Sequence, residues 1–526
     1  IYGVSKMNQY NIDIWYKQVQ ELFPQKLNKQ VINVTYINPK PKELGAVVGQ
    51  LAKTKGIDYA LSIIRELDGT FFNVENGYVI NTYRLPKKLL RARWDYHKIP
   101  PPIEPNIVVN WDECLLKGKH QFRQNTTCIN QLQAVAYMLD PQVIIEETPQ
   151  GIGDDTYRHD RVILDYLGQP FYFDWRYDAR GRSYSIGWDI NLQSDEYHKA
   201  MLSLANEELV TDEHALKIAI AGHAGQDKLS WGDRVAWFDD QEVFDTEYWP
   251  EPILGRKALR AYQECLDGIP SGYMMGIDAT ASGLQIMAVL SDCKETAVRV
   301  NLTGDDHRHD VYTHVANSMN NILNKRKVTR TDIKKPLMTM FYNSEAVPKQ
   351  VLTKRQYKAF IESSKDLLPG PMAVMQLVNE CFNPEAKQHK WVLPDGHVAV
   401  VDSSKTVQYN VVDEDYGKFH VHFKENRANK DQHRALAPNV IHSIDGWIAR
   451  EMVRRTDFEL VHIHDSFWFH PNNLNQVKQV YREILVDLNK MDLLRSIVKQ
   501  LTGTDPGKLS KGKLAKHIKA SSYALS

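Results

Sequence analysis

The chain has 526 residues, 43% of them hydrophobic, which is enough for roughly three domains with buried cores. Lysine plus arginine and aspartate plus glutamate both total 65, so the formal net charge of zero gives no support for a nucleic-acid partner. No uncharged apolar run reaches the roughly 18 residues of a membrane span, and no signal peptide is recognisable, so we expect a cytoplasmic protein. The five scattered cysteines contain no Cys-x-x-Cys pair and argue against a disulfide framework or a zinc site.

The first part of the chain is predicted to form a separate N-terminal module over 1–98. It is followed by the proline-rich run 100–105, which cannot continue a helix and favours an extended spacer. Because the chain begins at Ile1 rather than Met, we expect further residues before it. Two basic stretches, at 84–98 and 508–519, could contact phosphates, although such stretches are more often solvated surfaces.

The spacing of apolar residues predicts a mixed α/β chain in which helix predominates. Helical periodicity is clear over 127–139 and 311–323. Alternation of apolar and polar residues predicts strands later in the chain, at 392–401, 407–412, 419–423 and 460–469.

The segment 273–278 is a short apolar run that predicts a buried strand ending in Asp278. Small residues at 279–283 follow it, so the carboxylate is expected beside an open stretch of backbone. An aspartate at the end of a strand is more often the N-cap of the next helix, and for Asp278 taken alone this alternative stays open.

The segment 330–342 predicts a helix with a chemical stripe along one face. Spacing by four residues places Arg330, Lys334, Met338 and Tyr342 on that face. Two cations followed by an aromatic ring suit a nucleoside triphosphate with its base beyond the phosphates. A basic amphipathic helix taken alone is more often a solvated surface. Pro336 lies inside the segment, so we expect the helix to start late or to kink.

The segment 460–469 consists of two alternating half-strands, which predicts a hairpin with Asp465 at its apex. A simple turn aspartate is the alternative. Two carboxylates on neighbouring strands can instead share a pair of Mg²⁺ ions about 4 Å apart, which activate an attacking hydroxyl and stabilise the leaving oxygen of a phosphoryl transfer. Asp278 and Asp465 are therefore the candidates for a two-metal site.

Further short motifs accompany these three segments in a fixed order. In chain order they are Asp-Ala-Arg-Gly-Arg (178–182), Asp-Ala-Thr-Ala-Ser-Gly-Leu-Gln (278–285), the stripe from Arg330 to Tyr342 with Met338-Thr339, Ala-Pro-Asn-Val-Ile-His-Ser (437–443) and His-Asp-Ser-Phe (464–467). This order resembles that of the single-subunit RNA polymerases of bacteriophages and mitochondria. The resemblance extends from about residue 171 onward, and residues 523–526 are similar to the C-terminal foot of the phage enzymes.

The resemblance implies roles for the residues of the predicted metal and phosphate sites. Asp278 and Asp465 would bind two Mg²⁺ ions, with the backbone carbonyl of Ala279 as a further ligand. Arg330 and Lys334 would hold the triphosphate, and Lys334 would protonate the leaving pyrophosphate.

The resemblance also implies residues that contact the nucleotide and the template. Tyr342 would stack near the templating base pair, and His442 would help it to sense the 2′-hydroxyl. Tyr312 falls where the family has a tyrosine near the incoming nucleotide, and Arg182 would contact the template or the hybrid. The histidines just before Tyr312 fit helix capping and solvation better than a zinc site.

The fold that the resemblance implies is a right-hand polymerase, mixed α/β and mainly helical. The palm would comprise 171–306 and 443–526, the second part including the C-terminal foot. The fingers would comprise 307–442, with a hairpin at 391–423 that is similar to the family's promoter-specificity hairpin. Residues 99–170 would form a linker and a reduced thumb and N-terminal region.

The reaction that the resemblance implies is DNA-dependent RNA synthesis from NTPs, in the host cytoplasm if a phage encodes the protein. The region before Asp178 is shorter than in full-size phage enzymes, so we expect single-stranded or pre-melted DNA as template. The expected partner is a second polymerase subunit or a promoter-opening, single-stranded-DNA-binding protein. The alternatives are a right-hand DNA polymerase, whose fingers helix shares the spacing, and a non-catalytic nucleic-acid-binding transcription accessory protein.

Two features depart from the family pattern. Asn343 stands where the family usually has glycine, and asparagine also tolerates unusual backbone angles. The tip of the predicted hairpin is acidic at 413–415 and would repel phosphates. A promoter reader and a plain surface hairpin therefore both stay open.

Overall fold

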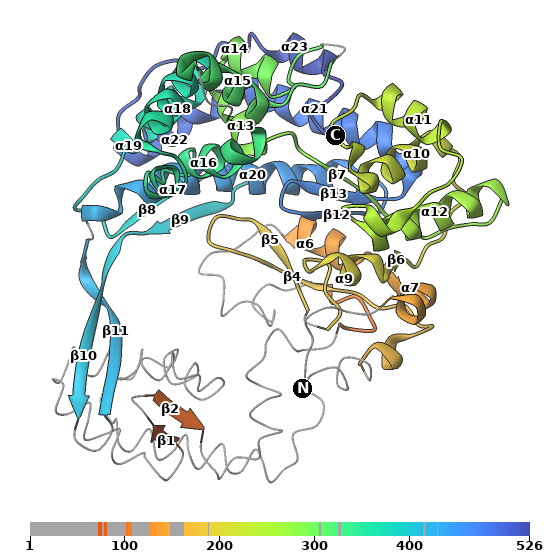
Figure 1. Cartoon of the computed structure of the whole chain (residues 1–526). Coiled ribbons are helices and arrows are strands. Elements are labelled where there is room, and N and C mark those ends of the chain that lie inside the picture. Colours follow the sequence, from red (N-terminus) through yellow and green to blue (C-terminus); the bar gives the residue numbers. More distant parts are fainter. Residues whose placement is uncertain are drawn as a thin grey trace. The chain divides into compact units, whose positions relative to one another are not determined.

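The computed structural model describes residues 72–75, 78–81, 101–107, 126–147, 162–187, 189–304, 307–324, 328–413, 417–428 and 430–526 (Figure 1). Two compact units are present; the first comprises Ile1–Ile99, Glu385–Lys387 and Ser403–Lys430, and the second comprises Pro100–Pro384, Gln388–Asp402 and Asp431–Ser526. Most of the predicted module 1–98, including its basic stretch, and the acidic residues 414–415 lie outside the described residues.

The described part of the first unit contains two antiparallel strand pairs. Strand β1 (Phe72–Glu75) pairs with β2 (Tyr78–Asn81), and β10 (Ser404–Asp413) pairs with the longer β11 (Gly417–Ala428). The alternating residues 407–412 and 419–423 thus form one hairpin, as predicted. The single strand predicted at 392–401 is wrong, because these residues span the end of β8 (Gln388–Val392), a turn and most of β9 (Val398–Asp402). Strands β8 and β9 pair with each other in the second unit, so the predicted hairpin 391–423 is not a single hairpin.

A three-stranded antiparallel sheet in the order β12-β13-β7 lies in the second unit. Strands β12 (Leu460–Ile463) and β13 (Ser466–Phe469) form the predicted hairpin, and β7 (Met275–Asp278) pairs with β13. Their apolar side chains are buried in the core, and Gly276 faces the Trp468 indole so closely that a Cβ atom would lie 2.8 Å from the ring. Both strand predictions are confirmed, and two distant segments become neighbours in one sheet.

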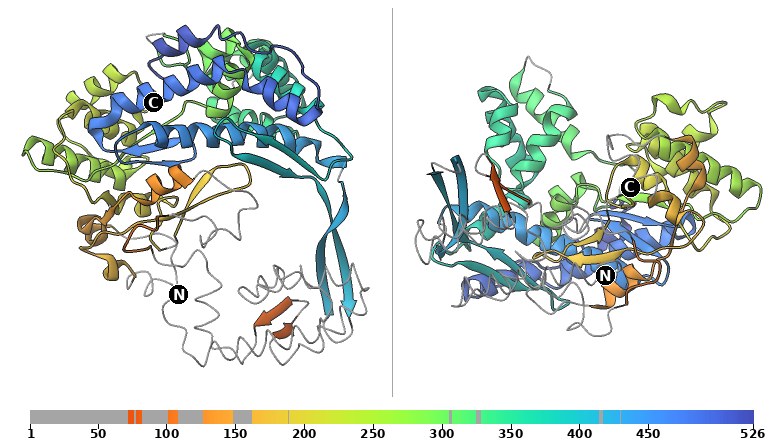
Figure 2. Two further views of the ribbon diagram at one scale, coloured as in Figure 1. Left: turned by 180° about the vertical axis from the view of Figure 1, so that it is seen from behind. Right: turned by 90° about the horizontal axis from the view of Figure 1, so that it is seen from below.

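Long helices pack around this sheet. Helix α20 (Leu436–Arg455) is buried along most of its length and packs against α13 (Ser282–Ser291) and α21 (Leu474–Lys490). One group of helices contains α10 (Glu213–Ala221), α11 (Trp231–Asp239) and α12 (Pro252–Leu266). Another contains α15 (Val311–Leu323), α16 (Arg330–Met340) and α18 (Lys354–Leu367). The view from below shows these two groups on opposite sides of the molecule (Figure 2).

Shorter elements complete the second unit, and two small sheets pair β3 with β6 and β4 with β5. The remaining bounds are α6 (Thr126–Gln133), β3 (Tyr137–Leu139), α7 (Pro141–Glu146), β4 (Asp174–Tyr177), β5 (Ser183–Ile186), α9 (Glu196–Ala200), β6 (Leu202–Leu204), α14 (Lys294–Arg299), α17 (Ala346–Val351), α19 (Pro369–Glu380), α22 (Leu493–Thr502) and α23 (Ala515–Ala520). The described residues are thus mainly helical with short sheets, as predicted. Among them, no helix is both long enough and apolar enough to cross a bilayer.

Two helix predictions need correction and one is confirmed. The predicted helix 127–139 ends at Gln133, because residues 137–139 instead form β3 and pair with β6. The predicted late start of α16 is wrong: the helix begins at Arg330, where a capping box between Thr329 and Asp332 fixes its first turn, and Pro336 lies within it. Helix α15 has the predicted bounds.

Candidate functional site

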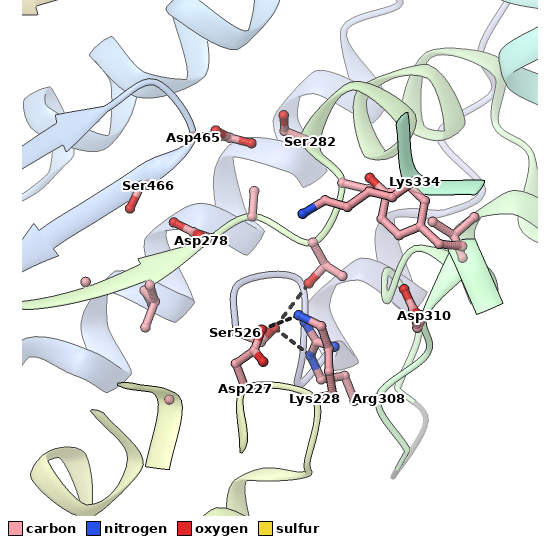
Figure 3. A pocket seen from close by; sticks show the side chains of 18 of the residues that line it. Asp227, Lys228, Asp278, Ser282, Arg308, Asp310, Lys334, Asp465, Ser466 and Ser526 are labelled. Carbon is pink, nitrogen blue, oxygen red and sulfur yellow. Dashed lines mark hydrogen bonds and ion pairs between the residues drawn. The ribbon is translucent and has the colours of Figure 1, made fainter. Parts of the chain in front are cut away.

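A cavity of about 950 Å³ is lined by β7, the turn between β12 and β13, and parts of α13, α15 and α16 (Figure 3). It brings together most of the residues that the sequence singled out, namely Asp278, Ala279, Tyr312, Arg330, Lys334, Tyr342 and Asp465. His442 and Arg182 are not among the lining residues, but both contact Tyr342, through its ring and its hydroxyl respectively.

The two carboxylates are held next to each other by the strand register. Asp278 is the last residue of β7 and pairs with Ser466, the first residue of β13. The backbone N–H of Ala279 donates to the carbonyl of Asp465 over 3.0 Å. Within the turn, His464 has φ of 58°, an unusual value for a residue with a side chain, so the turn that carries Asp465 is held in a strained conformation.

The surroundings of these carboxylates disfavour their charged forms. Burial raises the pKa of Asp278, the negative charge of Asp465 raises it further, and a hydrogen bond from Ser466 opposes the shift. Burial likewise raises the pKa of Asp465, with Asp445 acting in the same direction and a hydrogen bond from Ser282 opposing it. A cation between the two carboxylates would relieve this repulsion.

The donor set fits a hard divalent cation. Protein atoms surround Asp278 closely enough to shift its pKa, but its side chain opens onto the cavity, and Asp465 is half-buried at the cavity wall, so both carboxylates can be reached by an ion. Carboxylate and backbone carbonyl oxygens are the ligands that Mg²⁺ prefers. Asp278, Asp465 and the carbonyl of Ala279 are the groups that could hold such an ion.

A basic wall lies opposite the carboxylates. The Lys334 amine points into the cavity from α16 (Figure 3). One turn earlier, the Arg330 guanidinium lies 2.8 Å from the Asp310 carboxylate and 5.3 Å from the centre of the Tyr312 ring. Asp310 thus holds Arg330 against Tyr312, at the start of α15, and the residues of the predicted stripe all line the cavity.

Further cations line the same cavity, and no sequence motif marked them. Among them are Lys228, Arg234 and Arg308. Burial lowers the pKa of all three, that of Arg234 to about 10, and the positive charge of Arg308 contributes to the shifts of Lys228 and Arg234. Such mutual repulsion favours an anionic ligand. Arg308 lies close to Tyr312 in sequence and could have been noticed, whereas Lys228 and Arg234 belong to no motif.

Tyr342 and His442 form a contacting aromatic pair, with ring centroids 4.8 Å apart. Tyr342 lies just after α16 and His442 lies on α20. Burial and the nearby guanidiniums of Arg182 and Arg180 lower the pKa of His442 to about 3, so the imidazole is neutral at physiological pH. Asn343, at the position where the resemblance predicted glycine, has φ of 61°, which is the left-handed conformation that glycine adopts most readily.

The Arg182 guanidinium forms an ion pair within the protein. Its Nε and Nη2 donate to one oxygen of Asp445 over 3.0 and 2.7 Å, and only 14% of its side chain is exposed. Asp445 lies on α20, one turn after His442. The contact of Arg182 with template or hybrid stays a prediction, since this structure shows its guanidinium beside Tyr342 and Asp445.

Residues 523–526 run beside the end of β7. Leu525 forms an antiparallel bridge with Ala279, and the backbone N–H of Ser526 donates to the carbonyl of Asp278 over 2.9 Å. Thr280 adds a hydrogen bond from its hydroxyl to the carbonyl of Tyr523 over 2.7 Å, and Arg308 donates to the Ser526 hydroxyl over 2.8 Å (Figure 3). These residues therefore support both the carboxylate side and the basic side of the cavity.

The sequence is similar to proteins that are described as DNA-directed RNA polymerases. The sequence model of the family described as DNA-dependent RNA polymerase matches residues 256–403 and 390–524. The mitochondrial DNA-directed RNA polymerase of Schizosaccharomyces pombe is 24% identical over 405 residues, covering 63% of this chain and 35% of that protein. The DNA-directed RNA polymerase of Pseudomonas phage phiKMV is 23% identical over 394 residues, covering 61% and 48%.

A third relative covers more of the chain. The probable DNA-directed RNA polymerase of Gelasinospora sp. is 23% identical over 539 aligned positions, which include 84% of this chain and 64% of that protein. Across these three relatives, the chain spans between 35% and 64% of the length of the protein that it matches.

Proposed function

Because the chain belongs to the DNA-dependent RNA polymerase family, we propose that it transfers nucleotides from NTPs to an RNA 3′-hydroxyl on a DNA template. The observation that carries the proposal is the cavity itself, in which a carboxylate at the end of β7 and a carboxylate in the adjacent β12–β13 turn lie opposite lysine and arginine side chains. Phosphoryl transfer needs this combination, since charge develops on both the attacking and the leaving oxygen.

In the proposed reaction, the RNA 3′-hydroxyl gives its proton to water, and its oxygen bonds to the α-phosphorus of the NTP as the bond to pyrophosphate breaks. Asp278, Asp465 and the carbonyl of Ala279 would hold two Mg²⁺ ions, which would lower the pKa of the attacking hydroxyl and offset charge on the leaving oxygen. Arg330 and Lys334 bind the triphosphate, and Lys334 supplies the proton that the pyrophosphate takes up.

The cations missed by the sequence analysis extend the proposed phosphate site. Lys228, Arg234 and Arg308 contribute positive charge to the same cavity as Lys334, in which the β- and γ-phosphates would lie. Burial and the charges of neighbouring arginines lower the pKa of these groups, and an anion there would offset both effects.

Tyr342 and His442 are the proposed sensors of the ribose. Tyr342 reaches the cavity wall and packs against His442, so a nucleotide bound there would place its sugar near both polar side chains. A site that hydrogen-bonds a 2′-hydroxyl disfavours a nucleotide that lacks it, because its buried polar groups are then left unpaired. Tyr312 would pack near the incoming nucleotide and support Arg330.

The proposed domain roles follow the family. Residues 171–306 and 443–526 would act as palm and 307–442 as fingers, with a reduced thumb and N-terminal region before them. The proposed template is single-stranded or pre-melted phage DNA, and the proposed partner is a second subunit or a promoter-opening, single-stranded-DNA-binding protein.

Incorporation of a labelled nucleotide by the purified chain tests the proposal. The substrates are an RNA primer on a DNA template, single-stranded DNA, and duplex DNA, each given NTPs or dNTPs in parallel. We expect extension of the RNA primer with NTPs. Extension with dNTPs alone would identify a DNA polymerase, and scaffold binding without extension under any condition would identify a non-catalytic binding protein.

A further inference from the structure

We propose that Arg180 is a positioning residue that fixes the tautomer of His442, so that the imidazole presents an N–H donor to the sugar of the incoming nucleotide. This inference rests on the proposed function and deepens it, because it concerns how the ribose is recognised. Arg180 is the first arginine of the Asp-Ala-Arg-Gly-Arg motif, and no role was assigned to it from the sequence.

The contact that carries the inference joins Arg180 Nη1 to His442 Nδ1 over 2.9 Å. A guanidinium has only donors, whereas each nitrogen of a neutral imidazole is either a donor or an acceptor. Nδ1 must therefore accept from Arg180, and the ring proton must lie on Nε2. The alternative tautomer would place two N–H groups against each other at this distance.

Arg180 is itself held in place by Asp178. Its Nε and Nη2 donate to Asp178 Oδ2 over 2.8 and 2.5 Å. The other oxygen of Asp178 accepts from the backbone N–H of Arg180 over 2.9 Å and from that of Arg182 over 3.1 Å. One carboxylate thus fixes both the guanidinium and the turn that carries it, which leaves Nη1 free to reach His442.

The turn is also fixed against the helix that carries His442. Gly181 has φ of 89°, and a Cβ atom there would lie 2.5 Å from Arg450 Nη1, so the position requires glycine. A Cβ atom on Gly446 of α20 would lie 2.8 Å from the carbonyl oxygen of Gly181. The close approach of the two backbones keeps the turn beside α20, and Asp178 holds the guanidinium, so Arg180 stays within reach of His442.

The surroundings of His442 keep the ring neutral. Burial lowers its pKa to about 3, the positive charges of Arg182 and Arg180 act in the same direction, and Asp178 opposes them. A neutral ring with Nδ1 engaged by Arg180 has a single donor left, Nε2–H. That donor suits the oxygen of a 2′-hydroxyl, which a deoxyribonucleotide does not offer.

Nuclear magnetic resonance of the full chain labelled with ¹⁵N-histidine tests the tautomer without requiring activity. The signal of His442 is identified by its loss in His442→Asn. We expect wild type to show an unprotonated Nδ1 and a protonated Nε2. Arg180→Ala should lose this single tautomer, and Arg180→Lys, which keeps a donor and the charge, should restore it at least in part.

Primer extension with ATP and dATP supplies the second measurement. We expect the preference for ATP to fall about tenfold in Arg180→Ala, the order of one hydrogen bond, and to recover partly in Arg180→Lys. Arg176→Ala, on the neighbouring strand β4, is the matched control and should leave both the tautomer and the preference unchanged.

The inference is overturned if wild-type His442 carries its proton on Nδ1, or if Arg180→Ala retains the wild-type tautomer. It is also overturned if the tautomer changes while the preference for ATP stays the same. A chain that shows the expected tautomer but extends no primer would instead contradict the proposed function, because the resonance measurement does not depend on catalysis.

Discussion

Asp278 and Asp465 show how the fold brings like charges together at the residue scale. The antiparallel register places the end of β7 beside the start of β13. Burial raises the pKa of both carboxylates, the charge of Asp465 raises that of Asp278 further, and the charge of Asp445 raises that of Asp465. Without a bound cation this arrangement destabilises their charged forms. A folded protein retains such a pair where a cation or a reaction requires it, which is why the proposed metal site lies here.

At the same scale, Tyr342→Phe should reduce sugar discrimination while keeping RNA synthesis. The ring contact with His442 remains, but the hydroxyl that would register the ribose is lost. We expect the ratio of kcat/KM for ATP over dATP to fall about tenfold or more, with kcat for ATP within about threefold of wild type. An unchanged ratio would remove Tyr342 from the ribose sensor.

Buried His462 should make the protein less stable as the pH falls. Burial lowers its pKa from 6.5 to about 3, with His464 contributing. Between these two pH values, the unfolded chain binds a proton at this residue and the folded chain does not. Below about pH 6.5, the free energy of unfolding should therefore fall by up to about 1.4 kcal/mol per pH unit. Above about pH 6.5, His462 should not make the stability depend on pH.

Urea unfolding between pH 5 and 8 measures this dependence. His462→Gln should flatten the slope between about pH 6.5 and 5, whatever its effect on absolute stability. The exposed His214→Gln is the control and should keep the wild-type slope. An equal slope in wild type and His462→Gln would show that His462 is not the titrating group.

Site residues that belong to local sequence patterns could be predicted from the sequence alone. Asp278 and Asp465 end or join short apolar runs, and Arg330, Lys334 and Tyr342 share one helical face, so neighbouring residues were enough to indicate their placement. Lys228 and Arg234 reach the cavity only through tertiary packing, and no local spacing marks them. The pairing of Arg182 with Asp445 joins residues 263 positions apart and was equally out of reach.

At the scale of elements, predictions were correct where residues within one segment determine the structure, and incorrect where a distant segment does. The hairpin β12–β13 and helix α15 are determined by residues within one segment, and both have the expected form. Residues 137–139 become a strand because β6, about 65 positions later, supplies the hydrogen-bonding edge. The capping box of α16 is local but was not noticed, and it explains why the helix begins before its proline.

Gly446→Ala should separate the arginine turn from α20. The new Cβ atom would lie 2.8 Å from a backbone oxygen that has no freedom to rotate away. We expect a loss of about 1–3 kcal/mol of unfolding free energy, together with a lower preference for ATP over dATP, since His442 and Asp445 lie on this helix. Thermal and urea unfolding measure the first effect and primer extension the second.

Gly232→Ala is the control for this substitution. It also replaces a helical glycine, but no atom lies within 4 Å of the added Cβ. Its stability should change by less than about 1 kcal/mol, in the stabilising direction, because alanine favours helix. Equal effects of the two substitutions would mean that the close approach of α20 to Gly181 does not constrain the turn.

At the scale of the whole molecule, the charge balance bears on the template. The formal net charge is zero, and the hairpin that the sequence suggested as a promoter reader is acidic at 413–415. Both features weaken attraction to duplex DNA, which depends mainly on phosphate contacts. We therefore expect at least about tenfold more run-off product from a pre-melted template than from a closed duplex of the same sequence. Efficient promoter-specific product from linear duplex without an added protein would contradict this expectation.

The central claim is that this chain catalyses RNA synthesis with Asp278 and Asp465. Single-turnover extension of an RNA primer by one nucleotide, with enzyme in excess over scaffold and Mg²⁺ present, tests it most directly. We predict that wild type and Asp366→Asn, an exposed aspartate on α18, extend the primer equally. Asp465→Asn should be slower by about a thousandfold or more while binding the scaffold as wild type does, because an amide cannot replace the carboxylate as a metal ligand. Extension by Asp465→Asn at a rate near that of wild type would contradict the claim.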